Sequence, residues 1–302
     1  MNSIDKLIQL AGVRGNLDLR CRFQGSWARE HDQKPVGVAR YHIVLAGVCQ
    51  AVQPGHAPIT LRAGDILMIA DGEPHRLQSE GYDDAPSEAL VSQGGLLPLH
   101  RVGSGDGELD ILCGRFLYQR ESLLLGALPG FLKVSSAYPQ ITDQLSALVG
   151  LLRAEADGEQ IGARFLIDTL SSALFALIVR NYLLHHAPAS GTLALLSDKR
   201  LNKAWQAMLD DPAFEWTIDS LAEHASMSRA TFMRSFVKVA GESPWALLTR
   251  VRMELALRLL SETPHGLTDI ACQVGYQSQA AFSKKFKEHY GVSPGRARRS
   301  SV

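Results

Sequence analysis

Residues 221–244, LAEHASMSRATFMRSFVKVAGESP, and residues 270–294, IACQVGYQSQAAFSKKFKEHYGVSP, are two copies of one pattern. The residues of the first copy that recur fifty positions later include Ser228, Phe232, Phe236 and Gly241, which return as Ser278, Phe282, Phe286 and Gly291. A repeat of this kind predicts two copies of one supersecondary unit.

Each copy has the pattern of a short helix, a turn and a second helix. Ser228 and Ser278 are suited to cap the second helices, and the two phenylalanines of each copy, four residues apart, share a buried face. The opposite side is polar and partly cationic, as in a helix that enters a major groove while cations contact phosphates. The residues predicted to contact DNA are Ser228, Arg229, Ala230, Met233, Arg234, Gln279, Ala280, Ser283 and Lys284.

Charge is distributed unevenly, although the formal net charge is zero. Residues 199–302 hold 15 Lys and Arg against 10 Asp and Glu, whereas residues 1–198 hold 16 against 21. This asymmetry favours contact of a polyanion with the C-terminal part alone.

Length and composition exclude several classes of protein. A chain of 302 residues is long enough for two domains. No apolar run reaches the ~18–20 residues that a transmembrane helix needs, and no signal peptide is predicted. The four cysteines, separated by 28, 64 and 159 positions, form neither a disulfide scaffold nor a CxxC metal motif. We therefore expect a cytoplasmic protein with no membrane partner.

The pattern upstream of the repeat predicts an α+β fold with two domains. After a short helix near the N-terminus, apolar runs such as Val36–Ala46 alternate with turn residues up to Leu77, as in a β-barrel or sandwich. Residues 80–107 predict a long loop, and residues 108–118 a further strand. Helical periodicity follows over Ile141–Glu155 and Ala163–Leu184. We expect a first domain over 1–185, a linker over 186–198 and an all-helical domain over 199–302.

Residues 199–302 resemble the DNA-binding domain of the AraC/XylS family of transcription regulators. The resemblance is carried by Leu221-Ala222, Ser228–Phe236, the helix after Pro244, Ile270–Tyr276 and the segment from Phe282 to Pro294. It implies seven helices, with two helix-turn-helix units in successive major grooves of double-stranded promoter DNA. It also implies RNA polymerase as a partner, and a homodimer that forms through the Ile141–Glu155 helix together with Ala163–Leu184.

The N-terminal domain resembles a cupin, which implies a β-barrel with flanking helices. Gly64, Ala70, Gly72 and His75 follow the second cupin motif, with Ala70 in place of a proline. The first motif is partial, because Val44, two residues after His42, stands where a second histidine is usual. His42 and His75 are candidate ligands for a divalent metal in the cupin pocket, although three protein ligands are usual. The alternative is that both are buried histidines that line an effector pocket.

A closer resemblance, over nearly the whole chain, is to AraC-type activators that sense reactive chlorine species. It is carried by Cys21, Trp27, His31, His42, residues 61–64, His75–Leu77 and Leu112–Gly114. It implies that Cys21 and Cys113 sense an oxidant. A thiolate near arginine is a good nucleophile toward hypochlorous acid, but Arg20 and Arg22 would point away from Cys21 in a strand. The alternative is that both cysteines are buried packing residues.

The chain is therefore predicted to be a transcription regulator, in the first instance an activator, and not an enzyme. In the favoured hypothesis an oxidant such as hypochlorous acid acts on the cysteines. In the alternative, a small molecule or a metal in the cupin pocket is the effector. A cupin metalloenzyme is disfavoured because its ligand set is incomplete and two helix-turn-helix units would be superfluous.

Overall fold

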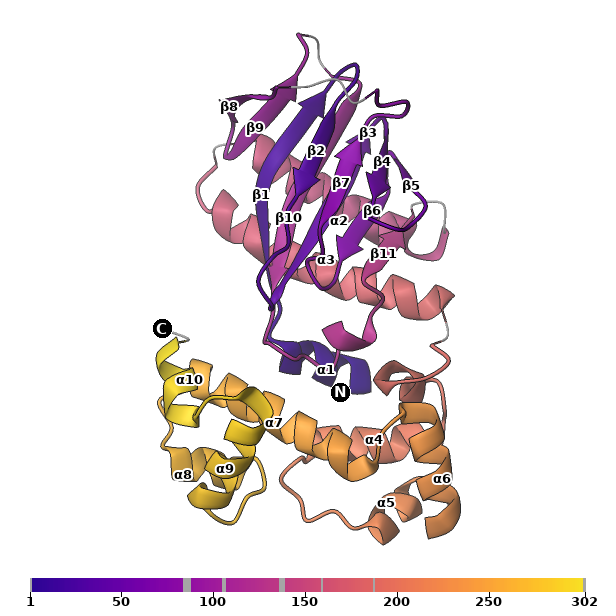
Figure 1. Cartoon of the computed structure of the whole chain (residues 1–302), viewed down its shortest axis with the longest axis vertical. Coiled ribbons are helices and arrows are strands. Elements are labelled where there is room, and N and C mark those ends of the chain that lie inside the picture. Colours follow the sequence, from indigo (N-terminus) through magenta and orange to yellow (C-terminus); the bar gives the residue numbers. More distant parts are fainter. Residues whose placement is uncertain are drawn as a thin grey trace. The chain divides into compact units, whose positions relative to one another are not determined.

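A computed structural model describes residues 2–83, 88–104, 107–135, 139–158, 160–186 and 188–300. Packing divides the chain into two compact units. The strand-rich unit contains Val13–Tyr118 and Leu128–His185, and the helical unit contains Met1–Gly12, Gln119–Ala127 and His186–Val302 (Figure 1). This confirms the predicted α+β fold class. The domain boundaries expected from the sequence, at residues 185 and 199, remain predictions. Residue 187 of the predicted linker lies outside the described residues.

The strand-rich unit holds two sheets whose inner faces share one core. The orders are β11-β6-β3-β10-β1-β9-β8 and β2-β7-β4-β5. Cys21, Leu67 and Ile111 of the first sheet and Cys49 and Leu77 of the second belong to this core. The strands are β1 (Arg14–Phe23), β2 (Ala28–His31), β3 (Val38–Ala46), β4 (Val48–Val52), β5 (Ile59–Arg62), β6 (Ile66–Ile69), β7 (His75–Gln78), β8 (Leu90–Gly94), β9 (Leu97–Val102), β10 (Leu109–Leu117) and β11 (Phe131–Val134).

Strand β10 lies between β1 and β3 and pairs with both in antiparallel orientation. Its pairing with β1 runs from Arg14 opposite Leu117 to Phe23 opposite Leu109. The register shifts between Leu17 and Leu19, so β1 carries a bulge or irregularity near its start.

The expectation of one long loop over residues 80–107 is wrong for Leu90–Val102. These residues form the antiparallel strands β8 and β9, joined at Gly95 with a φ of 79°. Strand β9 pairs in parallel with β1, which is far away in the sequence, and local composition cannot show such a partner. Residues 84–87, 105 and 106 of the expected loop lie outside the described residues.

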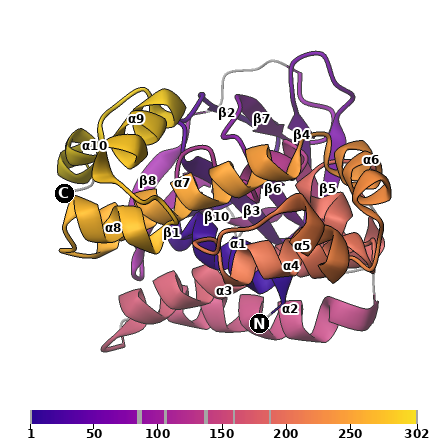
Figure 2. The same cartoon turned by 90° about the horizontal axis from the view of Figure 1, so that it is seen from below.

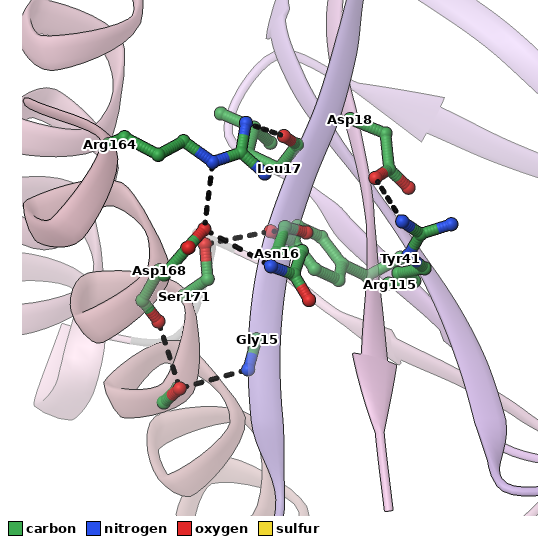
Figure 3. A network of polar contacts seen from close by, with 10 residues as sticks. Gly15, Asn16, Leu17, Asp18, Tyr41, Arg115, Arg164, Asp168 and Ser171 are labelled. Carbon is green, nitrogen blue, oxygen red and sulfur yellow. Dashed lines mark hydrogen bonds and ion pairs between the residues drawn. The ribbon is translucent and has the colours of Figure 1, made fainter. Parts of the chain in front are cut away.

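Two helices, α2 (Pro139–Asp157) and α3 (Ala163–His185), follow the strands as predicted. Helix α3 packs closely on β1. A Cβ atom at Gly15 would lie 2.4 Å from the backbone of Ser171, so only glycine allows this approach. The Gly15 amide donates to Ser172 Oγ at 2.9 Å, and Tyr41 lies 3.0 Å from both Ser171 Oγ and the Asn16 carbonyl (Figure 3).

Ten helical elements make up the described part of the helical unit. They are α1 (Ser3–Ala11), η1 (Leu125–Ala127), η2 (Thr192–Leu196), α4 (Leu201–Asp210), α5 (Ile218–His224), α6 (Arg229–Ala240), α7 (Pro244–Glu262), α8 (Leu267–Gln273), α9 (Gln279–Tyr290) and α10 (Pro294–Ser300). Within the described part of the chain, no helix is both long and apolar enough to cross a membrane.

Helices α5–α6 and α8–α9 are the two units expected from the repeat, and α7 runs between them (Figures 1 and 2). Ser228 and Ser278 cap α6 and α9 by accepting from the amides of Thr231 and Ala281. The phenylalanines of the repeat, Phe232, Phe236, Phe282 and Phe286, are fully buried. Because these side chains fix the inner face of α6 and α9, the opposite face of each helix is left to solvent.

Candidate functional site

The predicted DNA-contacting residues lie on the outer faces of α6 and α9. Seven of them are exposed: Ser228, Arg229, Ala230, Arg234, Gln279, Ala280 and Lys284. Met233 and Ser283 are half-buried at the edges of these faces. Each helix therefore presents its N-terminal half to solvent, the half with which a recognition helix contacts base edges.

Besides the capping Ser228, two of these side chains already contact neighbouring residues. Arg229 Nη1 lies 2.9 Å from Asp219 Oδ2, and Gln279 Oε1 accepts from Thr268 Oγ1 at 3.0 Å. Both contacts are on the surface, so they would yield to a phosphate or base at small cost in free energy. Among the predicted DNA-contacting residues, the exposed cations are Arg229, Arg234 and Lys284.

The two predicted sensor cysteines come from neighbouring strands of one sheet. Cys21 on β1 lies opposite Ile111, and Cys113 on β10 lies opposite Leu19. The cysteines are thus diagonal neighbours on the inner face, a relation in which Cα atoms are about 7–8 Å apart. Both thiols are free and buried. A hydrogen bond with Cys21, together with burial, raises the pKa of the Cys113 thiol well above its ordinary value.

A cavity of about 230 Å³ opens onto both thiols. Apolar side chains from β1, β7 and β10 form part of its wall, and Arg29, His31 and His100 supply polar groups. A small molecule that entered this cavity would meet Cys21 and Cys113 together. The thiols are therefore buried residues that nevertheless line an accessible space.

Next to the thiols lies a cluster of three histidines: His31 on β2, His42 on β3 and His75 on β7. One ligand atom from each lies within 4.8 Å of the others. His42 Nε2 is 2.9 Å from His75 Nε2, and His42 Nδ1 is 3.1 Å from Cys113 Sγ. The cluster therefore brings together His42 and His75, the two metal candidates of the sequence, and joins them to the thiol of Cys113.

The contacts fix the tautomers of His42 and His75. Burial lowers the pKa of His75 to about 4 and the pKa of His42 well below its ordinary value, so both rings are neutral at pH 7. His75 Nδ1 donates to the Glu73 carbonyl at 3.0 Å, which leaves Nε2 as an acceptor. His42 then donates from Nε2 and accepts the Cys113 S–H at Nδ1. The result is one hydrogen-bonded chain from the thiol to the backbone.

The cluster supplies three nitrogen donors, the least number of protein ligands that is usual for a Zn²⁺-class ion. His31, His42 and His75 would hold such an ion, with the Glu73 carbonyl and Cys113 orienting two of the rings from outside. The Arg40 guanidinium donates to His31 Nδ1 at 2.9 Å and would have to turn away. Among the described residues no carboxylate joins the group.

The sequence alone predicts no site role for His31 or for Arg40. His31 enters the cluster because it lies opposite His75 in the pairing of β2 with β7, and burial lowers its pKa to about 3. No spacing motif links these two histidines along the chain. The one available signal for Arg40 is its position two residues before His42, which places both side chains on the same face of β3.

Known protein families match both the N-terminal and the C-terminal part of the chain. Residues 3–184 match the Cupin family, and residues 221–300 match the Helix-turn-helix domain family. The chain belongs to the AraC/XylS family of regulators with an N-terminal cupin domain. It is 36% identical over 300 residues to an uncharacterised HTH-type transcriptional regulator of Haemophilus influenzae, an alignment that covers 99% of each chain.

Two further relatives of this regulator align over nearly their full length. The HTH-type transcriptional regulator MtrA of Neisseria gonorrhoeae is 32% identical over 302 residues, covering 99% of this chain and 98% of MtrA. The RCS-specific HTH-type transcriptional activator RclR of Escherichia coli is 27% identical over 300 residues, covering 99% and 97%. These relatives are transcriptional regulators, so the AraC-type protein is a DNA-binding regulator and the alternative of a cupin metalloenzyme is dropped.

Proposed function

We propose that this AraC-type regulator senses an oxidant such as hypochlorous acid through Cys21 and Cys113. The observation that carries the proposal is the placement of both thiols on adjacent strands, in contact with each other and with one cavity. Support also comes from the RclR relative, whose name describes it as RCS-specific. The proposal accounts for two cysteines that would otherwise be packing residues.

The reaction forms one S–S bond at the expense of two S–H bonds. The sulfur of one thiol attacks the chlorine of hypochlorous acid; its proton and the departing hydroxide form water, and a sulfenyl chloride remains. The second thiol attacks that sulfur, and chloride and a proton leave. The two sulfurs are oxidised and the chlorine is reduced to chloride.

Substitution of the cysteines tests this proposal. Cys21→Ser or Cys113→Ser should abolish the change in promoter affinity that follows one equivalent of hypochlorous acid, while leaving the affinity of the reduced regulator within about twofold, because neither residue lies on a helix of the helical unit. Cys49→Ser and Cys272→Ser are the matched controls, one buried in the same core and one exposed. Peptide mass spectrometry should find the Cys21–Cys113 disulfide in wild type and in both controls, but not in Cys21→Ser or Cys113→Ser. A full response in Cys21→Ser or in Cys113→Ser would contradict the proposal.

A metal ion is the second candidate effector, favoured by the third histidine of the cluster. Loading the full-length regulator with Zn²⁺ or Co²⁺ and measuring bound metal after gel filtration tests it. One ion per chain should bind to wild type and be lost in His31→Gln and His75→Gln. His100→Gln is the control, because His100 lines the thiol cavity but lies outside the cluster. Equal binding by all three variants would exclude the cluster as the site.

The remaining partners follow from the family and are part of the proposal. We propose that the regulator acts in the cytoplasm as a homodimer on double-stranded promoter DNA, and that it activates transcription by contact with RNA polymerase. Helices α2 and α3 are the proposed dimer surface. Large apolar side chains are exposed on these helices and their connection: Leu151, Ile161, Phe165, Leu166 and Leu184.

A further inference from the structure

The N-terminal helix α1 is a docked part of the helical unit. It packs on α4 and α7, and its inner face buries Ser3, Leu7 and Leu10. Ser3 Oγ lies 2.9 Å from Asn202 Oδ1 and 2.7 Å from Gln206 Oε1, both on α4. The helix ends at Gly12, whose φ of 57° turns the chain directly into β1.

A second segment, Gln119–Ala127, docks on the same unit. Its Leu123 amide donates to Glu254 Oε2 at 3.2 Å, and Glu254 is a buried carboxyl in the middle of α7. Glu121 lies 3.4 Å from His289 on α9, the second helix of the C-terminal helix-turn-helix unit. The Gln119 amide donates to the Ala11 carbonyl at 3.0 Å, so the two docked segments are also joined to each other.

These two segments continue the two strands that carry the sensor thiols. Residue Arg14, which begins β1, and Leu117, which ends β10, are register partners. From that pair, β1 leads back to α1 and β10 leads on to Gln119–Ala127. Cys113 is four residues from the end of β10 and Cys21 seven from the start of β1, or about 13 Å and 23 Å along the strands. The register shift at Leu17/Leu19 lies between Cys21 and the docked end.

We propose that β1 and β10, together with α1 and Gln119–Ala127, form a two-strand connector. This connector transmits the redox state of Cys21 and Cys113 to the helix-turn-helix units. Glu254 and Ser3 hold its docked end, which is α1 and Gln119–Ala127. The inference rests on the proposed function for its signal, but the mechanical link stands apart from the identity of the oxidant. Chain continuity, rather than a new interface, carries the change.

The geometry explains why formation of a disulfide would displace the strands of this connector. A disulfide requires Cα atoms about 4.4–6.8 Å apart, whereas diagonal neighbours in an antiparallel pair lie about 7–8 Å apart. Closing the Cys21–Cys113 bond therefore needs β1 to shift along or toward β10. The register irregularity in β1 allows such a shift. The docked end of the connector is attached to α4, α7 and α9, so a shift of β1 acts on these helices.

The test measures thiol reactivity in the full-length reduced regulator, without any oxidant. Rates of alkylation by N-ethylmaleimide are followed by peptide mass spectrometry at Cys21, Cys113 and Cys49. Glu254→Ala releases Gln119–Ala127, and Ser3→Lys lifts α1 from α4. Their matched controls are Glu254→Gln, which keeps an oxygen for the Leu123 amide, and Gln9→Lys, which adds the same charge at an exposed position of α1.

We expect Glu254→Ala and Ser3→Lys to change the rates at Cys21 and Cys113 by about threefold or more, while Cys49 on β4 and both controls keep the wild-type rates. Unchanged rates at Cys21 and Cys113 in Ser3→Lys would overturn the connector, even if Glu254→Ala unfolded and exposed all three thiols. A second measurement separates the two proposals. In Ser3→Lys the disulfide should still form on oxidation, but the ratio of oxidised to reduced promoter affinity should fall to about one. If the ratio of oxidised to reduced promoter affinity were one in the wild type, this would contradict oxidant sensing but not the connector.

Discussion

Glu254 is a buried carboxyl group on α7 that accepts a hydrogen bond from the Leu123 amide and has a raised pKa. Its carboxyl group is 2% exposed, and burial raises its pKa to about 7 against the opposing effects of the Leu123 amide, Ser122, Arg250 and Arg258. At neutral pH this group is therefore close to half-protonated. A neutral carboxyl still accepts the Leu123 hydrogen bond, so its protonated form is the one that suits the buried site.

The raised pKa predicts that stability falls with increasing pH. A carboxyl group whose folded pKa lies above its unfolded value stabilises the fold fully below pH 4.5, and this stabilisation is lost progressively up to about pH 7. The loss amounts to about 3 kcal/mol at most. Glu254→Gln should remove this loss, so this variant should be more stable than wild type at pH 8 and equally stable at pH 4. Urea unfolding followed by tryptophan fluorescence measures the difference.

The control for this comparison is Glu262→Gln, an exposed carboxyl on the same helix. It should keep the wild-type dependence on pH. Identical pH profiles for Glu254→Gln and wild type would contradict the assignment of the titrating group.

Individual site residues could be predicted from the sequence only where a local motif holds them. Ser228 and Ser278 were correctly predicted as caps because capping depends on residues within one helical turn. His31 was given no site role because it reaches His75 through the register of β2 and β7, which no local spacing encodes. The contact of Cys21 with Cys113 likewise depends on pairing across about ninety residues, so only the resemblance pointed to it.

At the scale of elements, helices were easier to predict than strands. The buried phenylalanines of α6 and α9 repeat at helical spacing, so the sequence alone defines both helices and their outer faces. The sequence predicts a loop in place of strands β8 and β9, because glycines and turn residues are frequent over residues 80–107. The two strands are stabilised instead by pairing with each other and, for β9, by pairing with the distant β1.

The outer faces of α6 and α9 carry the next prediction. Arg234→Ala and Lys284→Ala should each weaken promoter binding by ~1–3 kcal/mol if the side chain contacts a base, or lower the salt dependence by about one charge if it contacts a phosphate. Promoter affinity measured over a series of salt concentrations distinguishes the two. Lys285→Ala is the matched control, because this lysine is partly exposed on the same helix but its Nζ lies 3.3 Å from Glu288. An effect of Lys285→Ala as large as that of Lys284→Ala would refute the assigned face.

At the scale of the whole molecule, the division into units does not follow the order of the chain. Residues of α1 and Gln119–Ala127 belong by packing to the helical unit, although they flank the strands of the sensor. The sequence predicts both segments as part of the first domain, because hydrophobic periodicity shows that a helix has a buried face, but not which neighbour covers that face. The same limit applies to the outer surface of α2 and α3.

That outer surface leads to a prediction about the assembly. Phe165 is 74% exposed near the start of α3, and Leu151 on α2 is 55% exposed, whereas isolated soluble chains keep large apolar groups sparsely distributed. In a two-fold dimer the same residue is buried once on each subunit. Removing Phe165 should therefore weaken the free energy of dimerisation by about 3 kcal/mol or more. This corresponds to a roughly hundredfold rise in the dimer dissociation constant. Sedimentation velocity of Phe165→Glu should therefore show monomers at concentrations where wild type is dimeric. Val36→Glu, a 65% exposed apolar residue before β3, should leave the dimer intact. A Phe165→Glu protein that remained dimeric would place the interface elsewhere.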